Sequence, residues 1–426
     1  MIRVLHLTAH LGGGVGRALS ALSLAAAAAG RPTRHDFVTL EVPEKRAFAD
    51  RITGLGGAVH VRPSASRLAE LVADADVVQL EYWNHPATLA ALCSLPEALP
   101  TRLVVWSHVS GLHSPVVPNA LVMAAHRFIF TSPCSPGASG RHPHVDVVAS
   151  SGGFDHLPEA RLREPAPARR LWMGYAGTLS FSKLHPQYAD LVADIAAPGT
   201  SVRLIGDDTN REALQARARE RGRPDLFEFR GYREDVASEL GALDVLLYLL
   251  NPRHYGTTEN ALLEAMALGV VPIVLDNPVE RLIVRHGETG FVARTGGDAA
   301  ACAARLATEP DLLARLGTAA AADVRSRFAP ARTEAQLDRH YNEVMALPPR
   351  EVRFRDIFGD TPAEWFRRTQ EDPSAFGTDG SVRLPGSDDE RAGLAEPTKG
   401  SIHHFYRLFP ADPLLARWAA ALRAPA

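Results

Sequence analysis

Short apolar runs alternate with longer segments whose apolar residues recur at helical spacing. Runs typical of buried strands occupy residues 2–7, 36–40, 59–61, 77–80, 103–106, 128–130 and 145–149, and then 171–175, 202–205, 227–229, 245–248 and 270–275. Apolar runs without a polar side are typical of parallel strands that are covered on both faces. Strands that alternate with helices over this length predict an α/β fold with two doubly wound parallel sheets.

The segments between and after these runs indicate how the chain is divided. Residues 158–170 are rich in proline, arginine and glutamate and predict a linker. Residues 311–345 predict helices with a break near Pro330. We therefore expect a first domain at 1–165, a second at 166–330, and a last helix with a C-terminal extension at 331–426 that packs on the first domain. Within the extension, the polar segment 377–396 is expected to be mobile.

Composition narrows the class of protein. The chain has 426 residues, 46% of them hydrophobic, and a net charge of −3, so large cores are expected and a basic field for nucleic acid is absent. Residues 19–29 are too short and small-sided for a signal or membrane segment, and we expect a soluble cytoplasmic protein. Cys93, Cys134 and Cys302 lie far apart and favour buried thiols over a disulfide or zinc site.

Cation usage is uneven, since arginine far outnumbers lysine. Lys45, Lys183 and Lys399 are the only lysines, and together with abundant alanine this bias is typical of a GC-rich bacterial genome. Each lysine that remains is therefore a mild indication of a specific role.

Residues 254–292 combine a polar turn, a helix and a strand in close succession. The turn contains Thr257, Thr258, Glu259 and Asn260, and the helix that follows ends at Gly269. Free N–H groups and hydroxyls at the positive end of a helix form a natural seat for phosphate. Glu264, one turn into that helix, could accept hydrogen bonds from a ribose diol, although an acid on a solvated helix face is the commoner case. The combination favours a nucleotide site.

This stretch resembles the donor-sugar-nucleotide signature of retaining glycosyltransferases of family four, which have the GT-B fold of two facing Rossmann-like domains. In that family two glutamates eight positions apart bracket a glycine-rich turn, and the second binds the nucleotide ribose. Glu264 matches the second. Gly256 stands where the first would be, and Glu259 is the nearest replacement, so the resemblance leaves the donor sugar open.

Polar residues follow the strands of the first domain at the edge where a doubly wound sheet binds ligands. Gly13 and Gly14 lie in a glycine-rich turn that matches neither GxGxxG nor a P-loop, and a plain tight turn stays an alternative. Glu81 and His108 end two later strands. The resemblance implies that Gly13, Gly14 and Glu81 face the acceptor and that His108 contacts the donor sugar.

In the second domain, the loop from Gly177 to Lys183 follows the first strand. The resemblance implies that this loop and its lysine hold the diphosphate, whose charge must be stabilised as it departs. The family has an arginine where this chain has Thr178, and either Arg253 or Arg281 could compensate. Asp74 and Asp76 spell Asp-x-Asp but precede their strand, so we expect no metal and no cofactor.

The nucleotide site together with the resemblance implies a retaining transfer of a sugar from a UDP- or GDP-sugar to a small-molecule or glycan acceptor. The resemblance also implies that the helix after residue 331 is a crossover helix that returns to the first domain. His108 and Glu259 are the expected catalytic residues, and the expected donor-binding residues are Gly177, Lys183, Thr257, Thr258, Asn260 and Glu264. A nucleotide-sugar-binding protein without turnover is the main alternative, and an epimerase or phosphorylase is a third. A membrane-surface contact of the extension is an alternative that no pattern indicates.

Overall fold

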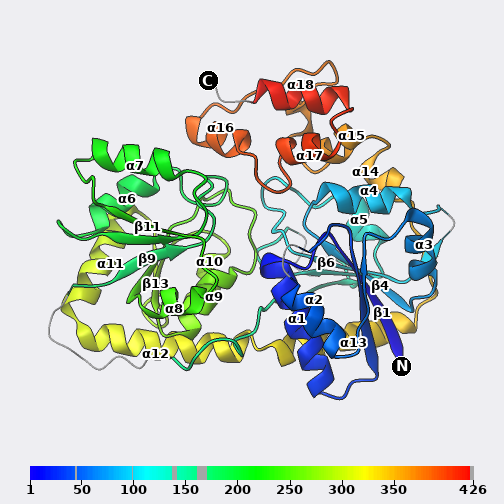
Figure 1. The fold of residues 1–426 in the computed structure, drawn as a ribbon, viewed down its shortest axis with the longest axis horizontal. Coiled ribbons are helices and arrows are strands. Elements are labelled where there is room, and N and C mark those ends of the chain that lie inside the picture. Colours follow the sequence, from blue (N-terminus) through cyan, green and yellow to red (C-terminus); the bar gives the residue numbers. More distant parts are fainter. Residues whose placement is uncertain (44–45, 98, 137–141, 161–169, 423–426) are drawn as a thin grey trace.

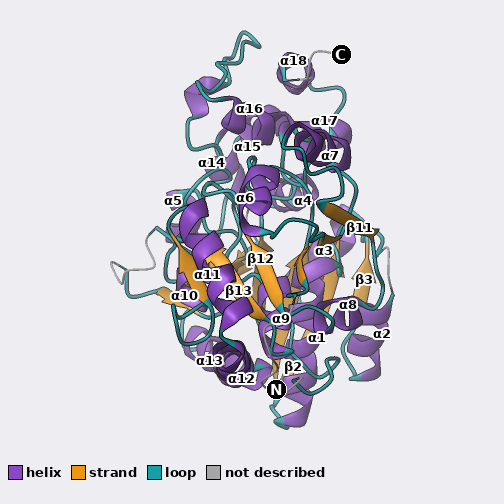
Figure 2. Ribbon diagram, turned by 90° about the vertical axis from the view of Figure 1, so that its left-hand side faces the viewer, coloured by secondary structure: helices purple, strands orange, loops and turns teal. Residues whose placement is uncertain are grey.

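The computed structural model describes residues 1–43, 46–97, 99–136, 142–160 and 170–422. Two α/β bodies lie side by side, and the C-terminal extension lies above the first of them and reaches toward the second (Figure 1). Viewed along the line that joins the two bodies, strands lie between helices on both sides (Figure 2). The predicted linker falls largely on residues 161–169, which lie outside the described residues.

The first sheet has seven strands in the order β3-β2-β1-β4-β6-β7-β8, and every neighbouring pair is parallel. Its strands are β1 (Ile2–Thr8), β2 (Thr33–Thr39), β3 (Val59–Val61), β4 (Val77–Tyr82), β6 (Leu103–Ser107), β7 (Arg127–Phe130) and β8 (Val145–Val147). The intervening helices are α1 (Gly13–Ala28), α2 (Ala47–Gly54), α3 (Ala65–Ala73), α4 (Pro86–Ser94) and α5 (Asn119–Ala124). This arrangement confirms the first predicted doubly wound sheet.

The second sheet has six strands in the order β11-β10-β9-β12-β13-β14, again all parallel. Its strands are β9 (Met173–Ala176), β10 (Val202–Ile205), β11 (Phe227–Gly231), β12 (Val245–Tyr248), β13 (Val271–Leu275) and β14 (Phe291–Ala293). Its helices are α6 (Tyr188–Ile195), α7 (Arg211–Glu220), α8 (Val236–Gly241), α9 (Asn260–Ala267), α10 (Glu280–Ile283) and α11 (Gly296–Thr308). The two sheets and their helices form two Rossmann-like domains, which is the fold that the sequence predicted.

Two long helices return the chain to the first sheet. Helix α12 (Pro310–Arg327) and helix α13 (Pro330–Met345) are separated at the predicted break near Pro330, because a proline supplies no N–H for helix bonding and is best tolerated in a first turn. Helix α13 packs against α1, with Leu337, Tyr341 and Val344 in the same buried cluster as Leu19 and Leu22. Helix α13 therefore completes the cover of one face of the first sheet.

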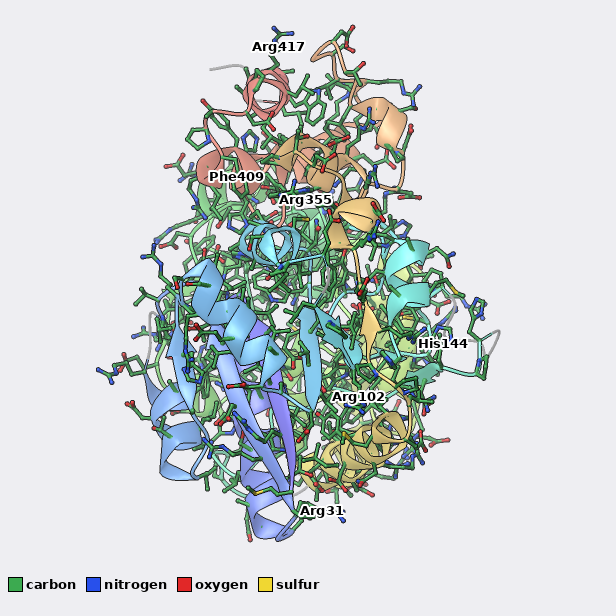
Figure 3. All side chains as sticks on the ribbon, turned by 90° about the vertical axis from the view of Figure 1, so that its right-hand side faces the viewer. Arg31, Arg102, His144, Arg355, Phe409 and Arg417 are labelled. Carbon is green, nitrogen blue, oxygen red and sulfur yellow. The ribbon has the colours of Figure 1, made fainter. Side chains whose placement is uncertain are left out.

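The extension forms a cap of short elements on the opposite face of that sheet. They are β15 (Arg350–Glu351), α14 (Phe354–Phe358), α15 (Pro362–Arg367), the 3-10 turn η1 (Pro373–Ala375), α16 (Asp388–Ala395), α17 (Ile402–Leu408) and α18 (Pro413–Ala421), and β15 pairs antiparallel with β5 (Pro100–Thr101). Phe358, Phe405 and Trp418 are buried in one cluster with Leu80 and Leu89 of the first domain. Arg355, Phe409 and Arg417 mark this cap in Figure 3, far from Arg31 at the other end.

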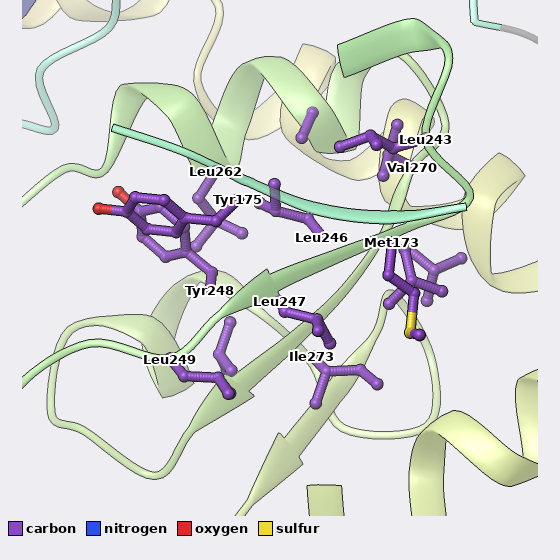
Figure 4. Close-up of a cluster of buried hydrophobic side chains, with 14 of the residues drawn as sticks. Met173, Tyr175, Leu243, Leu246, Leu247, Tyr248, Leu249, Leu262, Val270 and Ile273 are labelled. Atoms are coloured by element: carbon purple, nitrogen blue, oxygen red, sulfur yellow. The ribbon is translucent and has the colours of Figure 1, made fainter. Parts of the chain in front are cut away.

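Two buried tyrosines connect the core of the second domain with the carboxyl edge of its sheet. Tyr175 of β9 and Tyr248 of β12 are fully buried and stack with ring centroids 5.6 Å apart. Their hydroxyl groups lie together at one end of the apolar cluster (Figure 4). Burial of a tyrosine favours a hydrogen-bond partner for its hydroxyl, and this pair thus directs polar groups to the carboxyl edge of the sheet.

One sequence-based boundary was wrong. Helix α1 begins at Gly13, so Gly13 and Gly14 belong to its first turn instead of a glycine-rich turn that precedes it. Residues 377–396, whose expected mobility stays a prediction, contain α16 and end at Glu396, which is 8% exposed. Within the described part of the chain, no helix is long and apolar enough to cross a lipid bilayer.

Candidate active site

The starts of two helices meet between the domains. A Cβ added to Gly14, in the first turn of α1, would lie 2.5 Å from Nδ2 of Asn260, the first residue of α9. Gly13 has a φ of 57°, which favours glycine, and it allows the chain to turn into α1 at this point. Because the first N–H groups of any helix lack partners within it, two convergent helix starts form a site that favours an anion.

The loop before α9 is fixed against the first domain. The N–H of Ser110 donates to the carbonyl of Tyr255 at 2.9 Å, and the Thr258 hydroxyl lies 3.5 Å from the carbonyl oxygen of Thr131. Thr257 is buried in the same loop. The strand ends of the first domain therefore lie directly opposite the turn that was predicted to hold a diphosphate.

Glu264 lies at a cavity between the two domains. Its carboxylate accepts a hydrogen bond from Nη1 of Arg17 in α1, and His156 Nε2 lies 3.9 Å from it. Burial raises the pKa of Glu264, while the guanidinium of Arg17 acts in the opposite direction. The cavity has a volume of about 390 Å³, and its wall also includes Glu234 and Asp235 beside α8. Carboxylates around such a space are suited to accept hydrogen bonds from hydroxyl groups.

The buried carboxylate of Glu259 forms an ion pair with Lys183, whose side chain is 23% exposed. Nζ of Lys183 lies 2.8 Å from Oε2 of Glu259, and the Tyr248 hydroxyl donates to the same oxygen at 2.6 Å. Burial by itself would raise the pKa of Glu259, but the charges of Lys183 and His254 and the hydrogen bonds from Lys183 and Tyr248 outweigh it and hold the pKa at about 2. His254 in turn lies 2.9 Å from Glu280. Glu259 is therefore a carboxylate at any ordinary pH.

The carboxylate of Glu259 occupies the space beside Gly256. A Cβ added to Gly256 would lie 1.8 Å from Oε1 of Glu259 and 2.9 Å from Nδ1 of His254. The acid three positions later thus fills the volume that a side chain at 256 would need. The structure in this way gives a physical reason for the glycine, since only a residue without a side chain leaves room for Glu259.

His108 ends a hydrogen-bonded chain that crosses the first sheet. Its Nε2 lies 2.7 Å from Oε2 of Glu81, Oε1 of Glu81 lies 2.8 Å from Nδ1 of His6, and Nε2 of His6 lies 2.8 Å from Nδ1 of His35. Gln79 also donates to Glu81 at 2.8 Å. Burial, followed by the charge of His6, lowers the pKa of His35 to about 3, so that ring is neutral. Buried polar groups of the first sheet, beginning with Glu81, therefore fix the position of the His108 side chain.

The prediction that Glu81 faces an acceptor is corrected by this arrangement. Glu81 is 0% exposed, and both of its oxygens already have partners. Burial would raise its pKa, but hydrogen bonds from His108 and His6 outweigh this and lower the pKa to about 2. Both oxygens of Glu81 are therefore used to hold neighbouring side chains, among them His108.

Two sets of residues resemble metal ligands, and the first is the Asp-x-Asp pair. Asp74 caps the end of α3 and Asp76 accepts from the N–H of Arg3, as expected for a helix end and turn. Among the described residues, Glu41, His85 and His404 have candidate ligand atoms within 4.8 Å of one another. However, Nδ1 of His85 accepts from Ala87 N at 3.1 Å and Nδ1 of His404 from Gly400 N at 2.9 Å. A histidine that binds a metal donates from its other nitrogen, so this group does not fit a metal centre.

The remaining sequence predictions are placed as follows. Gly177 begins the Lys183 loop with a φ of 148°, and its N–H donates to Ile205. Arg253 pairs with Glu371 of the extension at 2.6 Å, away from the Glu259–Lys183 pair. Sequence reasoning missed Arg17, whose position directly after a glycine turn was the only available signal. The partners His6, His35, Tyr248 and His254 carried no local signal.

Known proteins resemble this chain in part of its sequence and in its fold. Residues 171–308 match the family model described as Glycosyl transferases group 1. A search of the curated proteins found no match. Among solved structures, Anabaena HepE in complex with UDP and glucose is 17% identical, with a TM-score of 0.62 over 80% of this chain and 100% of that chain. Sucrose-phosphate synthase from Thermosynechococcus elongatus is 16% identical, with a TM-score of 0.61 over 81% of this chain and 100% of that chain.

A glycosyltransferase from Rickettsia africae, 13% identical, aligns with a TM-score of 0.62 over 81% of this chain and 98% of its own. At these identities the structural likeness concerns the fold. The fold and the matched family model define the class of protein, an enzyme of the glycosyltransferase class with GT-B architecture.

Proposed function

We propose that the protein is a retaining glycosyltransferase that moves a sugar from a UDP- or GDP-sugar to an acceptor hydroxyl. The observation that carries this proposal is the contact of Arg17 with Glu264 between the domains, beside the convergent starts of α1 and α9. Helix starts suit a diphosphate, and a carboxylate next to them suits a ribose diol. The similar Anabaena HepE structures contain UDP and glucose, UDP, or UDP-glucose, which supports a nucleotide-sugar donor here.

In this proposal each group has one task. Glu264 binds the ribose, and His108 and Glu259 contact the donor sugar. The diphosphate is held by Gly177, Lys183, Thr257, Thr258 and Asn260, with the N–H groups of α9 adding positive charge. Gly13 and Gly14, which the resemblance assigns to the acceptor side, bring the backbone of the first domain close to Asn260 of α9. Glu81, His6 and His35 keep His108 in position and do not contact the substrates.

The bond changes follow from this placement. The bond between the anomeric carbon and the diphosphate oxygen breaks, and its electron pair leaves with the nucleoside diphosphate. The acceptor oxygen bonds to the anomeric carbon on the face that the diphosphate vacates, so the configuration is retained. The acceptor proton passes to the departing phosphate oxygen. Lys183 and the start of α9 stabilise the charge that develops on that oxygen.

Isothermal titration with UDP and GDP tests the donor half of the proposal. We expect wild type to bind one of them, and Glu264→Gln to bind it about tenfold to a hundredfold more weakly, because a hydrogen bond to a charged group is lost. Glu288→Gln, at an exposed position of the same domain, is the matched control and should bind like wild type. Failure of folded wild type to bind either nucleotide would contradict the proposal.

A binding protein without turnover is the second candidate. Gly256 and Thr178 carry no charge, whereas the family that this chain resembles has a glutamate and an arginine at these two positions. Donor hydrolysis and transfer by wild type and by His108→Ala separate the two candidates. Turnover that is lost in His108→Ala supports the enzyme. Nucleotide binding without turnover for any UDP- or GDP-sugar supports the binder.

A further inference from the structure

A second and larger cavity lies where the extension meets both domains. Its volume is about 640 Å³, within the range of small-molecule sites. Pro115 of the first domain, Ser182 and Tyr255 of the second, and Leu384 and Leu394 of the extension all line it. The cavity therefore exists only because the extension closes over the edge between the two domains.

This cavity adjoins the Glu259–Lys183 pair. Ser182 precedes Lys183 in the chain, and the N–H of Asn251, another residue of the wall, donates to the carbonyl of Lys183 at 2.7 Å. Tyr255 follows His254, which lies 3.8 Å from Glu259. A molecule in the cavity would thus have one end toward Glu259, proposed to contact the donor sugar, and Lys183, proposed to hold the diphosphate.

Two of the three lysine and arginine side chains in the wall form ion pairs with acids of the same wall, and Glu390, another acid of the wall, lies 3.5 Å from Arg253. Arg253 pairs with Glu371 at 2.6 Å, and Arg383 pairs with Asp372. The third cation of the wall, Lys399, lies 3.1 Å from Nε2 of His10 and 5.9 Å from the ring centre of Trp83.

Apolar side chains provide much of the remaining wall. Leu384 is 47% exposed although it is a large apolar residue, and Pro115, Pro186, Pro252 and Leu394 also line the cavity. Apolar surface that lines a concave site is a common feature of ligand pockets. The chemistry of the wall therefore favours an uncharged molecule with an apolar part.

The extension is fixed to the loop of Lys183 by one buried carboxylate. Glu396 accepts hydrogen bonds from the N–H groups of Phe181 at 2.8 Å and Ser182 at 3.0 Å, and also from the Ser180 hydroxyl and the Asn210 amide. Hydrogen bonds to an ionised and buried acceptor are among the stronger ones in proteins. This contact holds the wall of the cavity in place beside the proposed sugar site.

We propose that this cavity is the acceptor site, and that the acceptor is an uncharged alcohol with an apolar body. The reacting hydroxyl lies toward Glu259 and Lys183, and the apolar body lies against Leu384 and Leu394 of the extension. The inference rests on the proposed function, since an acceptor exists only if a sugar is transferred.

The test compares hexyl β-glucoside with methyl β-glucoside in NMR titrations of the full chain, with UDP binding measured in parallel. We expect wild type to bind the hexyl glucoside at least about tenfold more tightly, because its additional methylenes are buried. Leu384→Glu should abolish this preference without changing the affinity for UDP. Leu347→Glu is the matched control, because Leu347 is 42% exposed and does not line the cavity.

Each outcome bears on a separate claim. Equal affinity of wild type for the two glucosides, or a preference that Leu384→Glu retains, overturns the acceptor site while UDP binding still supports the proposed function. A preference that depends on Leu384 in a protein that does not bind UDP or GDP overturns the acceptor role and the proposed function together. A preference that depends on Leu384 together with nucleotide binding supports both.

Discussion

Nε2 of His108 lies 2.7 Å from Oε2 of Glu81, although 27 residues separate them in the chain. The sheet explains this proximity, because β4 and β6 are parallel neighbours in which Tyr82 pairs with Ser107. The residues at the carboxyl ends of these strands are thereby brought together, and Glu81 in the buried strand approaches a histidine at the rim. A carboxylate that fixes an imidazole in this way determines the position of the ring and which nitrogen carries the proton.

The first prediction concerns this pair. Glu81→Gln removes the charge that orients His108 and should lower kcat for sugar transfer about a hundredfold, since small displacements of a positioned group cost that much. The KM for the donor should change little. The pH dependence of kcat should also shift, which a purely structural role would leave in place. A variant with wild-type kcat and pH profile would contradict the positioning role.

The sequence predicted both sheets because strand and helix periodicities are local properties. Residues 245–248 and 270–275 were recognisable from their apolar runs alone, and the structure has β12 and β13 there. The contacts that complete the site are different in kind. Arg17 and Glu264 are 247 residues apart, and His6 and Glu81 are 75 apart. Such pairs follow from how the strands and domains are placed, which no local pattern of a single sequence contains.

Glu259 shows a second reason why the spacing of residues in a sequence predicts only part of a site. A motif fixes which position should carry a carboxylate, but a side chain from a neighbouring position can reach the same volume. Here the Glu259 carboxylate lies where a side chain of Gly256 would be. The sequence showed a missing acid at 256 and a candidate at 259, and the fold shows that the carboxylate of Glu259 fills the volume beside Gly256.

The second prediction is the effect of Gly256→Ala. The added methyl group would lie 1.8 Å from Oε1 of Glu259, so the carboxylate must move away from Lys183 and Tyr248. Overpacking of this kind typically destabilises a protein by about 1–3 kcal/mol, and transfer activity should fall with it. Urea unfolding and transfer assays measure the two effects. Gly241→Ala is the control, because nothing lies within 4 Å of its added Cβ; equal effects of both substitutions would refute the interpretation.

The third prediction is a pH dependence of stability that comes from Glu259. Its pKa in the folded protein is about 2, below its ordinary value of 4.5. The carboxylate therefore stabilises the fold above pH 4.5, and this contribution is lost as the pH falls from 4.5 to 2. A shift of this size corresponds to roughly 3 kcal/mol. The difference in unfolding free energy between wild type and Glu259→Gln should shrink as the pH falls through this window, whereas the exposed Glu351→Gln should show no such trend.

The fourth prediction uses the close approach of Gly14 and Asn260. Gly14→Ala places a methyl group 2.5 Å from Nδ2 of Asn260, which should separate the two helix starts and weaken UDP binding by about tenfold. Asn260→Ala in the same protein removes the clash and should restore part of the affinity. A double-mutant cycle from titrations should then give a coupling of about 0.5–3 kcal/mol. Additive effects of the two substitutions would show that the residues do not meet.

The fifth prediction concerns Glu396, through which the extension holds the Lys183 loop. Glu396→Ala leaves the N–H groups of Phe181 and Ser182 without the acceptor that they have in wild type, and unsatisfied buried donors cost about 1–3 kcal/mol. Because that cost is relieved if the loop opens, hydrogen exchange of these two amides should become faster by at least about tenfold. Sugar transfer should fall as well, since Lys183 loses its fixed position. Glu390→Ala is the control, as Glu390 lies 3.5 Å from Arg253 and is not a partner of the loop. Unchanged exchange of Phe181 and Ser182 in Glu396→Ala would mean that the extension does not hold the loop.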